Sequence, residues 1–160
     1  MGKLSKEVGT TFEKLFEVHC RQRQMAFIKI PDGCRRVSLG GLGVKLIPVK
    51  TPFDFFICKN GKSATVDCKT IDAALFKYSL CDQDQVNALT VTGEHIPSGY
   101  IIWFRETNRV VFFSVVLLRM LQQRTSLRDT DGLLLGDIDR FNPELILNLT
   151  VKPNTQGTLI

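Results

Sequence analysis

Hydrophobic and polar positions alternate with several periods along the chain, and each period predicts an element. Near the N-terminus the apolar positions recur at three- and four-residue steps, which predicts an amphipathic helix over residues 3–20 with one face made by Leu4, Val8, Phe12, Leu15, Phe16 and His19. A short strand is predicted at 25–31. Further along, the pattern predicts a helix at 82–91, apolar strands at 100–104 and 110–113 joined by a turn, and a helix at 114–124.

Residues 53–69 alternate around Asn60-Gly61, the strongest short-range signal for a two-residue type I′ turn. In the hairpin that this predicts, Lys59 faces Lys62 and one face is wholly apolar. We expect that face to lie on the core, with Phe53, Phe55, Ile57, Ala64, Val66 and Cys68. The same register places Asp54 across from Asp67, with β-carbons roughly 5 Å apart.

The predicted pair of carboxylates needs a positive charge beside it. Lys69 projects on the same face as Asp67, two residues further along the strand. Two carboxylates so close repel each other unless a cation lies between them, which favours a metal site. The alternative is a solvated strand face in which Asp67 and Lys69 form a weak salt bridge.

Length and composition restrict the class of protein. The chain has 160 residues, of which 44% are hydrophobic and 23% charged, as expected for one folded α/β domain and not for a disordered chain. The longest uncharged apolar stretch, 110–118, is too short to span a bilayer, and the N-terminus lacks the apolar core of a secretory signal. We therefore expect neither secretion nor membrane insertion.

Cysteine usage indicates the cellular compartment. The five cysteines are an odd number and form no CxxC pair, so we expect free thiols in a reducing cytoplasm. The two histidines lie far apart and give no zinc signature.

Positive charge is concentrated in the first third of the chain. Residues 1–50 hold ten Lys and Arg against four Asp and Glu, a net charge of +6, whereas the remainder has a net charge of −1. This excess suggests a polyanionic partner, most simply nucleic acid. Residues 32–51 combine four glycines with Arg35, Arg36, Lys45 and Lys50, which predicts a mobile basic loop that grips DNA; the alternative is a solvated charge run.

Two acidic motifs and their context resemble a known nuclease group. The chain contains Pro52-x-Asp54, twelve intervening residues and Asp67-x-Lys69, a pattern similar to that of the PD-(D/E)XK nuclease superfamily. Five blocks, two of which contain this pattern, resemble in the same order those of Holliday junction resolvases of the RecU and archaeal Hjc types: GTTFEKLF, TPFDFF, DCKT, DQVNAL and GYIIWF. The chain departs from them by Asp67 in place of a frequent Glu, and by Asp84 where RecU proteins tend to have His.

The resemblance implies a restriction-endonuclease-like α/β core, a central mixed sheet flanked by helices, with a Mg²⁺ site where Mn²⁺ is expected to substitute. It implies that Asp54, Asp67 and the main-chain carbonyl of Cys68 bind the metal and that Lys69 orients the attacking water. Glu13 would bind through water or a second ion, and Gln85 would position the water or the Lys69 ammonium. The residues leave alternatives open: Glu13 as an ordinary exposed helix residue, Gln85 as part of a capping box with Asp82, and the Cys68 side chain as core.

The resemblance implies a metal-dependent endonuclease for branched DNA, specifically a four-way junction, in a prokaryotic or phage-infected cell. We expect a nuclease core at 1–124, an extension of the same domain at 125–160 with loose last residues, and a symmetric homodimer. The apolar stretches at 100–104, 110–118, 133–135 and 145–149 offer interface surface, unless they pack inside the monomer. Alternative functions are a restriction-, nicking- or flap-type nuclease of the same fold and a non-catalytic nucleic-acid-binding module.

Overall fold

The computed structural model of the chain describes residues 2–31, 33–38, 44–49, 51–120 and 126–151. The helices are α1 (Gly2–Gln22), α2 (Gln83–Gly93), α3 (Val115–Met120) and α4 (Glu144–Leu147), with a 3-10 turn η2 (Tyr78–Leu80). The strands are β1 (Ala26–Lys29), β2 (Gly33–Ser38), β3 (Val44–Val49), β4 (Phe55–Lys59), β5 (Lys62–Ile71), β6 (Leu75–Lys77), β7 (Ser98–Phe104), β8 (Arg109–Ser114), β9 (Ser126–Arg128) and β10 (Leu133–Asp137).

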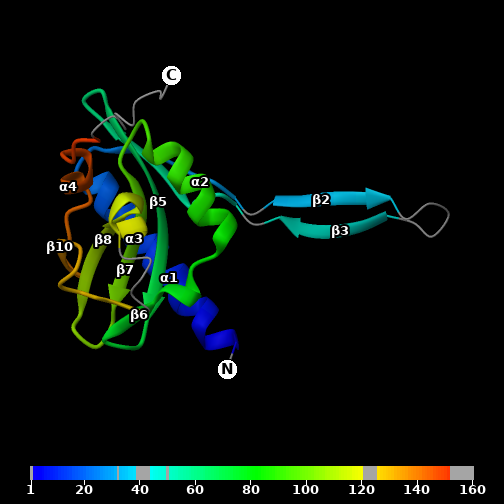
Figure 1. Cartoon of the computed structure of the whole chain (residues 1–160), viewed down its shortest axis with the longest axis horizontal. Helices are drawn as coiled ribbons and strands as arrows, with labels where there is room; N and C mark the ends of the chain where they lie inside the picture. The colour runs from blue at the N-terminus through cyan, green and yellow to red at the C-terminus, as the bar shows by residue number, and fades with distance from the viewer. Residues whose placement is uncertain (1, 32, 39–43, 50, 121–125, 152–160) are drawn as a thin grey trace, which may run out of the picture.

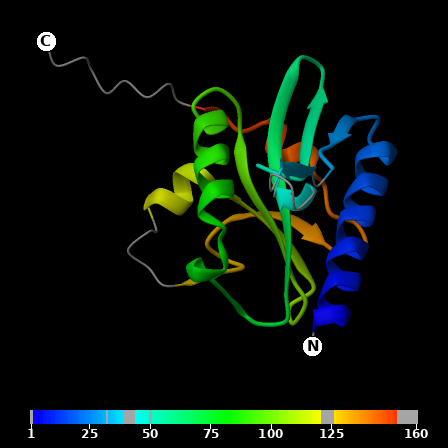
Figure 2. The ribbon, with the colours of Figure 1, turned by 90° about the vertical axis from the view of Figure 1, so that its right-hand side faces the viewer.

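Six of these strands form one mixed sheet in the order β1-β4-β5-β7-β8-β10. Strands β5 and β7 run parallel because the chain between them crosses over through α2, and the other pairs in the sheet are antiparallel. Helix α1 covers one face of the sheet, and α2 and α3 cover the other (Figures 1 and 2). Helices therefore flank the sheet on both faces, as the α/β prediction requires.

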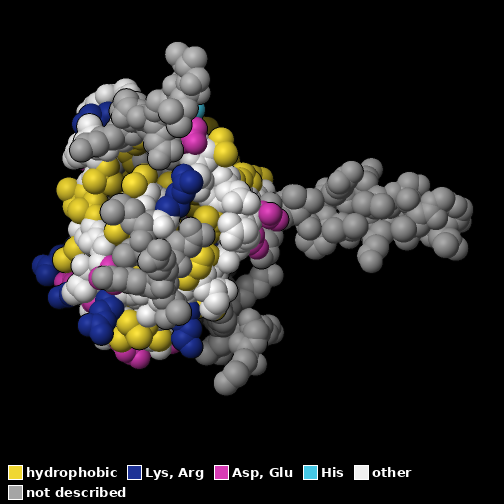
Figure 3. Space-filling view, in the orientation of Figure 1, with side chains coloured by type: hydrophobic (Ala, Val, Ile, Leu, Met, Phe, Trp, Pro, Cys, Tyr) yellow, Lys and Arg dark blue, Asp and Glu magenta, His cyan; other side chains and the backbone are white. Residues whose placement is uncertain are grey.

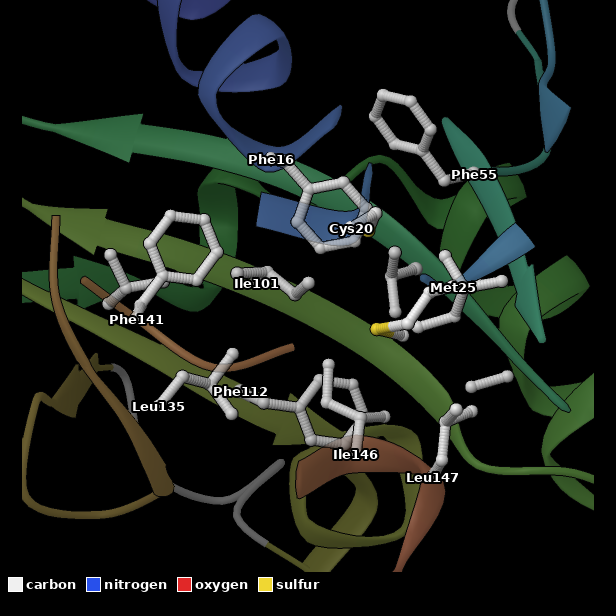
Figure 4. Close-up of a cluster of buried hydrophobic side chains, with 14 of the residues drawn as sticks. Phe16, Cys20, Met25, Phe55, Ile101, Phe112, Leu135, Phe141, Ile146 and Leu147 are labelled. Atoms are coloured by element: carbon white, nitrogen blue, oxygen red, sulfur yellow. The ribbon is translucent and has the colours of Figure 1, made fainter. Parts of the chain in front are cut away.

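The core on the α1 face is rich in aromatic side chains (Figure 4). Phe16 of α1 is fully buried and its ring lies 4.9 Å from that of Phe55 on β4. Phe141 packs against Phe12 and Phe16 from the segment before α4. Ile146 and Leu147 close this cluster from α4, so the C-terminal part of the described chain belongs to the core.

A second core lies on the opposite face, under α2 and α3. Strand β7 alternates between the two cores, with Tyr100, Ile102 and Phe104 in the second and Ile101 in the first. Strand β8 alternates in the same way. The apolar residues at 100–104 and 110–113 therefore pack inside the protomer and do not supply an interface; of the nearby stretch, Val116 is exposed.

The β4–β5 hairpin confirms the predicted register. Its cross-strand pairs run from Phe55↔Val66 to Lys59↔Lys62, and the turn residues Asn60 and Gly61 have φ values of 52° and 75°, as a type I′ turn requires. The prediction for Phe53 is wrong, because this side chain packs against the second core. The ladder ends at Phe55: the amide of Asp54 donates to the Val66 carbonyl at 3.1 Å, and the strict alternation does not continue beyond it.

The prediction of a mobile loop at 32–51 is wrong for the residues that the structure describes. Strands β2 and β3 pair in antiparallel register from Gly33↔Val49 to Ser38↔Val44 and project from the body as an arm (Figure 1). The β-branched residues of this segment favour strand, and the clustered glycines at 40, 41 and 43 fall between the two strands instead of within them. Lys50 lies outside the described residues.

The other predicted elements hold with shifted bounds. Helix α3 begins after Ser114, whose hydroxyl accepts from the Leu117 amide at 3.2 Å, and residues 121–125 of the predicted helix lie outside the described part. Residues 70–80 contain the end of β5, strand β6 and η2, and the last residues, which are predicted to be loose, lie outside the described part of the chain. Among the described helices, none has the length and apolarity to cross a bilayer.

Candidate active site

Asp54 lies where β4 and β5 separate. Strand β5 continues to Ile71, but its antiparallel partner β4 begins only at Phe55, so the next amides of β5 lose their partners on that side. The Asp54 carboxylate takes the place of one missing β4 carbonyl, because its Oδ2 accepts from the Cys68 backbone N–H at 2.7 Å. The break in the ladder thus fixes one carboxylate against the backbone of the strand that carries the other.

Asp67 and Lys69 project on the α2 face of β5. Asp67 is fully buried, and its Oδ2 lies 2.6 Å from the Lys69 ammonium nitrogen. Within the described residues, this Oδ2 accepts no hydrogen bond of good geometry. A carboxylate is rarely fully buried, and a buried carboxylate oxygen rarely lacks a hydrogen bond, so this position differs from an ordinary solvated strand face.

Gln85, in the first turn of α2, connects the parts of the cluster. Its Nε2 donates to Asp67 Oδ1 at 2.8 Å and to the Thr51 carbonyl at 3.4 Å, and its Oε1 accepts from Lys69 Nζ at 3.1 Å. The Asp82 carboxylate caps the helix by accepting from the backbone N–H of Gln85 at 3.4 Å and that of Asp84 at 3.0 Å. The Asp82 half of the expected capping box is therefore present, whereas the Gln85 side chain donates to Asp67.

The site disfavours the charged forms of its own acids. Burial, together with repulsion from Asp67, raises the pKa of Asp54 to about 7, although the Cys68 N–H opposes the shift. Burial also raises the pKa of Asp67, with the Lys69 ammonium opposing it. Burial raises the pKa of the Cys68 thiol well above its usual range, and its side chain packs against the first core as expected.

Glu13 reaches the site from α1 on the other side of the sheet. Its carboxylate forms an ion pair with Lys29 Nζ at 2.7 Å, and its side chain is 26% exposed. The Glu13 charge contributes to the raised pKa of both Asp54 and Asp67, so it lies within electrostatic range of them. The structure thus brings four of the five predicted catalytic side chains into one cluster, with Glu13 beside it.

The donor set suits a hard divalent cation. Among the described residues, no group of three or more His, Cys, Asp or Glu side chains is arranged to hold a metal ion. Mg²⁺ needs fewer protein ligands than that, because it is commonly held by one or two carboxylates and keeps several waters. Two neighbouring carboxylates with raised pKa values, of which Asp67 is fully buried and has an oxygen that accepts no hydrogen bond in the described structure, fit such an ion.

The predicted DNA-binding residues lie on the arm next to this cluster. Arg35 and Arg36 belong to β2 and Lys45 to β3, but their side chains are outside the described part of the structure, as is Lys50. The arm is anchored beside the acids, since Thr51, near its end, accepts from Gln85. The base of the arm therefore lies beside the acids.

Sequence analysis missed three residues around the site. Lys29 pairs with Glu13; Thr51 contributes its carbonyl to Gln85; and the buried Tyr100 of β7 lies beside Asp67, with its ring centroid 5.6 Å from Lys69 Nζ. The signal for Tyr100 was present as an apolar strand after the 82–91 helix, which is typical of a parallel crossover. Thr51 gives no signal, because it acts through its backbone.

Comparison with known proteins supports the fold. No protein-family model matches the chain, and no curated protein sequence matches it. Among solved structures, the chain is similar to Hjc of Archaeoglobus fulgidus, a Holliday junction resolvase from an archaeal hyperthermophile, with a TM-score of 0.55 and 16% identity. The match covers 79% of this chain and 95% of the resolvase. The predicted fold is therefore confirmed: this chain has the mixed α/β nuclease fold that Hjc has.

Proposed function

We propose that this chain is a Mg²⁺-dependent endonuclease that cleaves branched DNA, most specifically a four-way junction. The observation that carries the proposal is the cluster of Asp54, Asp67, Lys69 and Gln85, held together at the separation of β4 and β5. The likeness of the fold to an archaeal junction resolvase supports the choice of substrate.

Asp54 and Asp67 are the proposed metal ligands, with the main-chain carbonyl of Cys68 as a third and Glu13 acting through water or a second ion. Bound Mg²⁺, for which Mn²⁺ is expected to substitute, would lower the pKa of a coordinated water and offset charge on the phosphate. Asp54 is oriented by the Cys68 amide at 2.7 Å, so its second oxygen is left for the ion. The protein thus supplies two positioned carboxylates.

Lys69 is the proposed group that orients the attacking water and stabilises developing negative charge. Its ammonium lies 2.6 Å from Asp67 and 3.1 Å from the Gln85 amide oxygen, so its position is fixed from two elements. Gln85 holds Asp67 and Lys69 at once and is proposed as a positioning residue.

The β2–β3 arm is the proposed DNA grip, through phosphate contacts by Arg35, Arg36, Lys45 and Lys50. Substitution of each by Ala should weaken binding about equally for all sequences and lower the slope of log affinity against log salt by roughly one unit. Binding measured by fluorescence anisotropy at several salt concentrations checks this. An unchanged slope in the fourfold variant would assign the arm another task.

We propose a symmetric homodimer, because resolution of a four-way junction requires two related cuts and each chain holds one cluster. Several apolar side chains remain exposed on and near α3, β10 and α4: Val116, Leu134, Leu145 and Leu149. Figure 3 shows hydrophobic side chains on the side of the molecule where these elements lie. Light scattering at micromolar concentration, with and without junction DNA, checks the mass. A protein mass near 18 kDa in both conditions, after subtraction of the DNA mass from that of the complex, would contradict the dimer and favour a nicking enzyme.

The decisive experiment is cleavage of a synthetic four-way junction by the wild-type chain and by Asp67→Asn, with and without Mg²⁺. Flap and linear duplex substrates run in parallel separate a resolvase from the flap- and restriction-type alternatives. Absence of Mg²⁺-dependent cleavage on all three substrates would leave the non-catalytic nucleic-acid-binding module. Four cysteines are free thiols in the described structure, in keeping with action in the reducing cytoplasm of a prokaryotic or phage-infected cell.

A further inference from the structure

One part of the sheet remains open on the side that carries the acids. Helix α2 packs over β5 and β7 on this side, where Thr65 and Asp67 are buried. Strands β1 and β4 at the edge are less covered: Ile28 is 61% exposed, and Phe56 is only partly buried. Register pairs these two residues across the strands, so they share one face.

A pocket of about 440 Å³ lies on this open part, next to the hairpin turn. Its lining includes Gln24, Ala26, Phe56, Cys58 and Ser63. Ala26 pairs with Cys58, and Cys58 pairs with Ser63, so the floor is a continuous strip across three strands. Phe56 belongs to neither core cluster of the described residues, so its partial burial does not come from core packing.

The strip leads from the acids toward the turn. Phe56 and Cys58 follow Asp54 at two-residue steps, and two residues of strand span roughly 6.8 Å. A DNA strand with its phosphate at Asp54 and Asp67 therefore has its next nucleotides within reach of Phe56. The pocket and the Asp54 carboxylate therefore lie on the same face of the sheet.

The chemistry of the strip suits a base more than a phosphate. Among the described residues, the lining contains no Asp or Glu, and its floor is aromatic, aliphatic or uncharged. Of the two lysines at the rim, Lys59 is paired with Glu144 at 2.8 Å, whereas Lys62 donates to the Asn148 side-chain oxygen at 3.1 Å and has no acidic partner among the described residues. An aromatic floor beside a single free positive charge is typical of sites that stack unpaired bases.

We propose that this pocket binds unpaired nucleotides of the DNA strand that leaves the active site, with one base stacked on Phe56. The inference rests on the proposed function for the identity of the strand and deepens it. It assigns the open β1–β4 face to strand-end or branch-point recognition, which the arm and the acids do not provide. Fully paired duplex has no free base face to offer and gains nothing from the pocket.

Fluorescently labelled duplexes with and without a five-nucleotide oligothymidylate extension test the proposal. Binding is measured in EDTA, so that it does not depend on cleavage. Wild type should bind the extended duplex more tightly than the blunt one. Phe56→Leu should weaken binding of the extended duplex about tenfold and leave the blunt duplex unchanged, because base stacking needs the ring. Phe56→Tyr, which keeps the ring, should retain wild-type affinity.

Val91→Ala is the control, since Val91 is exposed on α2, outside the pocket and the proposed dimer face, and should change neither affinity. Circular dichroism melting confirms that each variant is folded. The proposal would be overturned if wild type bound the two duplexes with equal affinity, or if Phe56→Leu lost the same amount of affinity for both. Junction cleavage by wild type is scored separately: a protein that fails to cleave but shows the Phe56-dependent preference loses the proposed activity and keeps the binding site.

Discussion

The two faces of β5 differ in what they contribute to the protein. On the α1 face, Ala64 and Val66 are fully buried among aromatic rings and stabilise the fold. On the α2 face, Asp67 is equally buried but carries a carboxylate whose charged form burial disfavours. A strand with alternating side chains can thus combine a stabilising face with a face that is electrostatically unfavourable without a cation, and the first holds the second in place.

The largest expected effect separates the faces by activity. Asp67→Asn should lower Mg²⁺-dependent junction cleavage by at least roughly 10³-fold, because it removes a charged metal ligand at the reacting phosphate. Junction affinity should stay equal or increase, since less negative charge faces the phosphates. Single-turnover cleavage and anisotropy measure the two quantities. Full activity in this variant would remove the proposed site.

The next effect separates the faces by stability. Phe16→Ala should lower the free energy of unfolding by about 3–5 kcal/mol, because Phe16 is fully buried against Phe55 and Phe141. Urea denaturation measures it, and the exposed Val116→Ala should stay within about 0.5 kcal/mol of wild type. At a temperature where the variant is folded, its cleavage rate should match wild type. A large loss of cleavage in the folded variant would mean that the two faces are coupled.

A smaller effect tests the positive charge of Lys69 beside Asp67. Lys69→Ala should lower the cleavage rate by roughly 10²-fold if its ammonium stabilises developing charge. The loss should appear in kcat and not in junction affinity, because Lys69 is tied to Asp67 and Gln85 within the protein. Single-turnover kinetics at saturating enzyme checks this. A normal kcat in Lys69→Ala would show that Lys69 serves only as a counter-charge for Asp67.

The smallest effect concerns the electrostatic penalty itself. The folded pKa of Asp54 is raised to about 7 from 3.8, so the stability that its neutral form provides is fully present below 3.8 and is lost as pH rises through 7. Without metal at pH 8, Asp54→Asn should therefore raise Tm by roughly 2–4 °C, which corresponds to about 1 kcal/mol. The Asn oxygen can still accept from the Cys68 amide.

Lowering the pH to 5 is the control for this variant, because the folded carboxyl is then mostly protonated and the gain should shrink. Added Mg²⁺ at pH 8 should raise the Tm of wild type and not of Asp54→Asn. A gain independent of pH would show that the Asp54 charge is not the cause.

The local parts of this comparison were predictable from sequence. The Asn60-Gly61 turn determines every pair from Phe55 to Lys59, because a two-residue turn leaves no freedom of register. The closeness of Asp54 and Asp67 follows from that register. The break at Asp54, which turns Phe53 to the second core, did not follow, since alternation alone gives no sign of where a ladder ends.

The long-range parts were not predictable. The pairing of β10 with β8 joins residues distant in sequence, and its register shifts between Leu134 and Gly136, where Gly136 has a φ of 134°. Composition predicts a loop for the arm because glycines dominate a segment that also contains good strand residues. The sequence predicts Gln85 as a site residue, but its hydrogen bond to Asp67 depends on how α2 packs after the crossover.

The parallel pairing of β5 with β7 also orders the assembly of the site in time. A hairpin such as β4–β5 forms within roughly 1–10 μs, because its contacts are local. Parallel pairing requires the chain to close a long crossover through α2 before any contact forms, so it is slower. We therefore expect Asp54 and Asp67 to be brought together during folding before Gln85 arrives from α2.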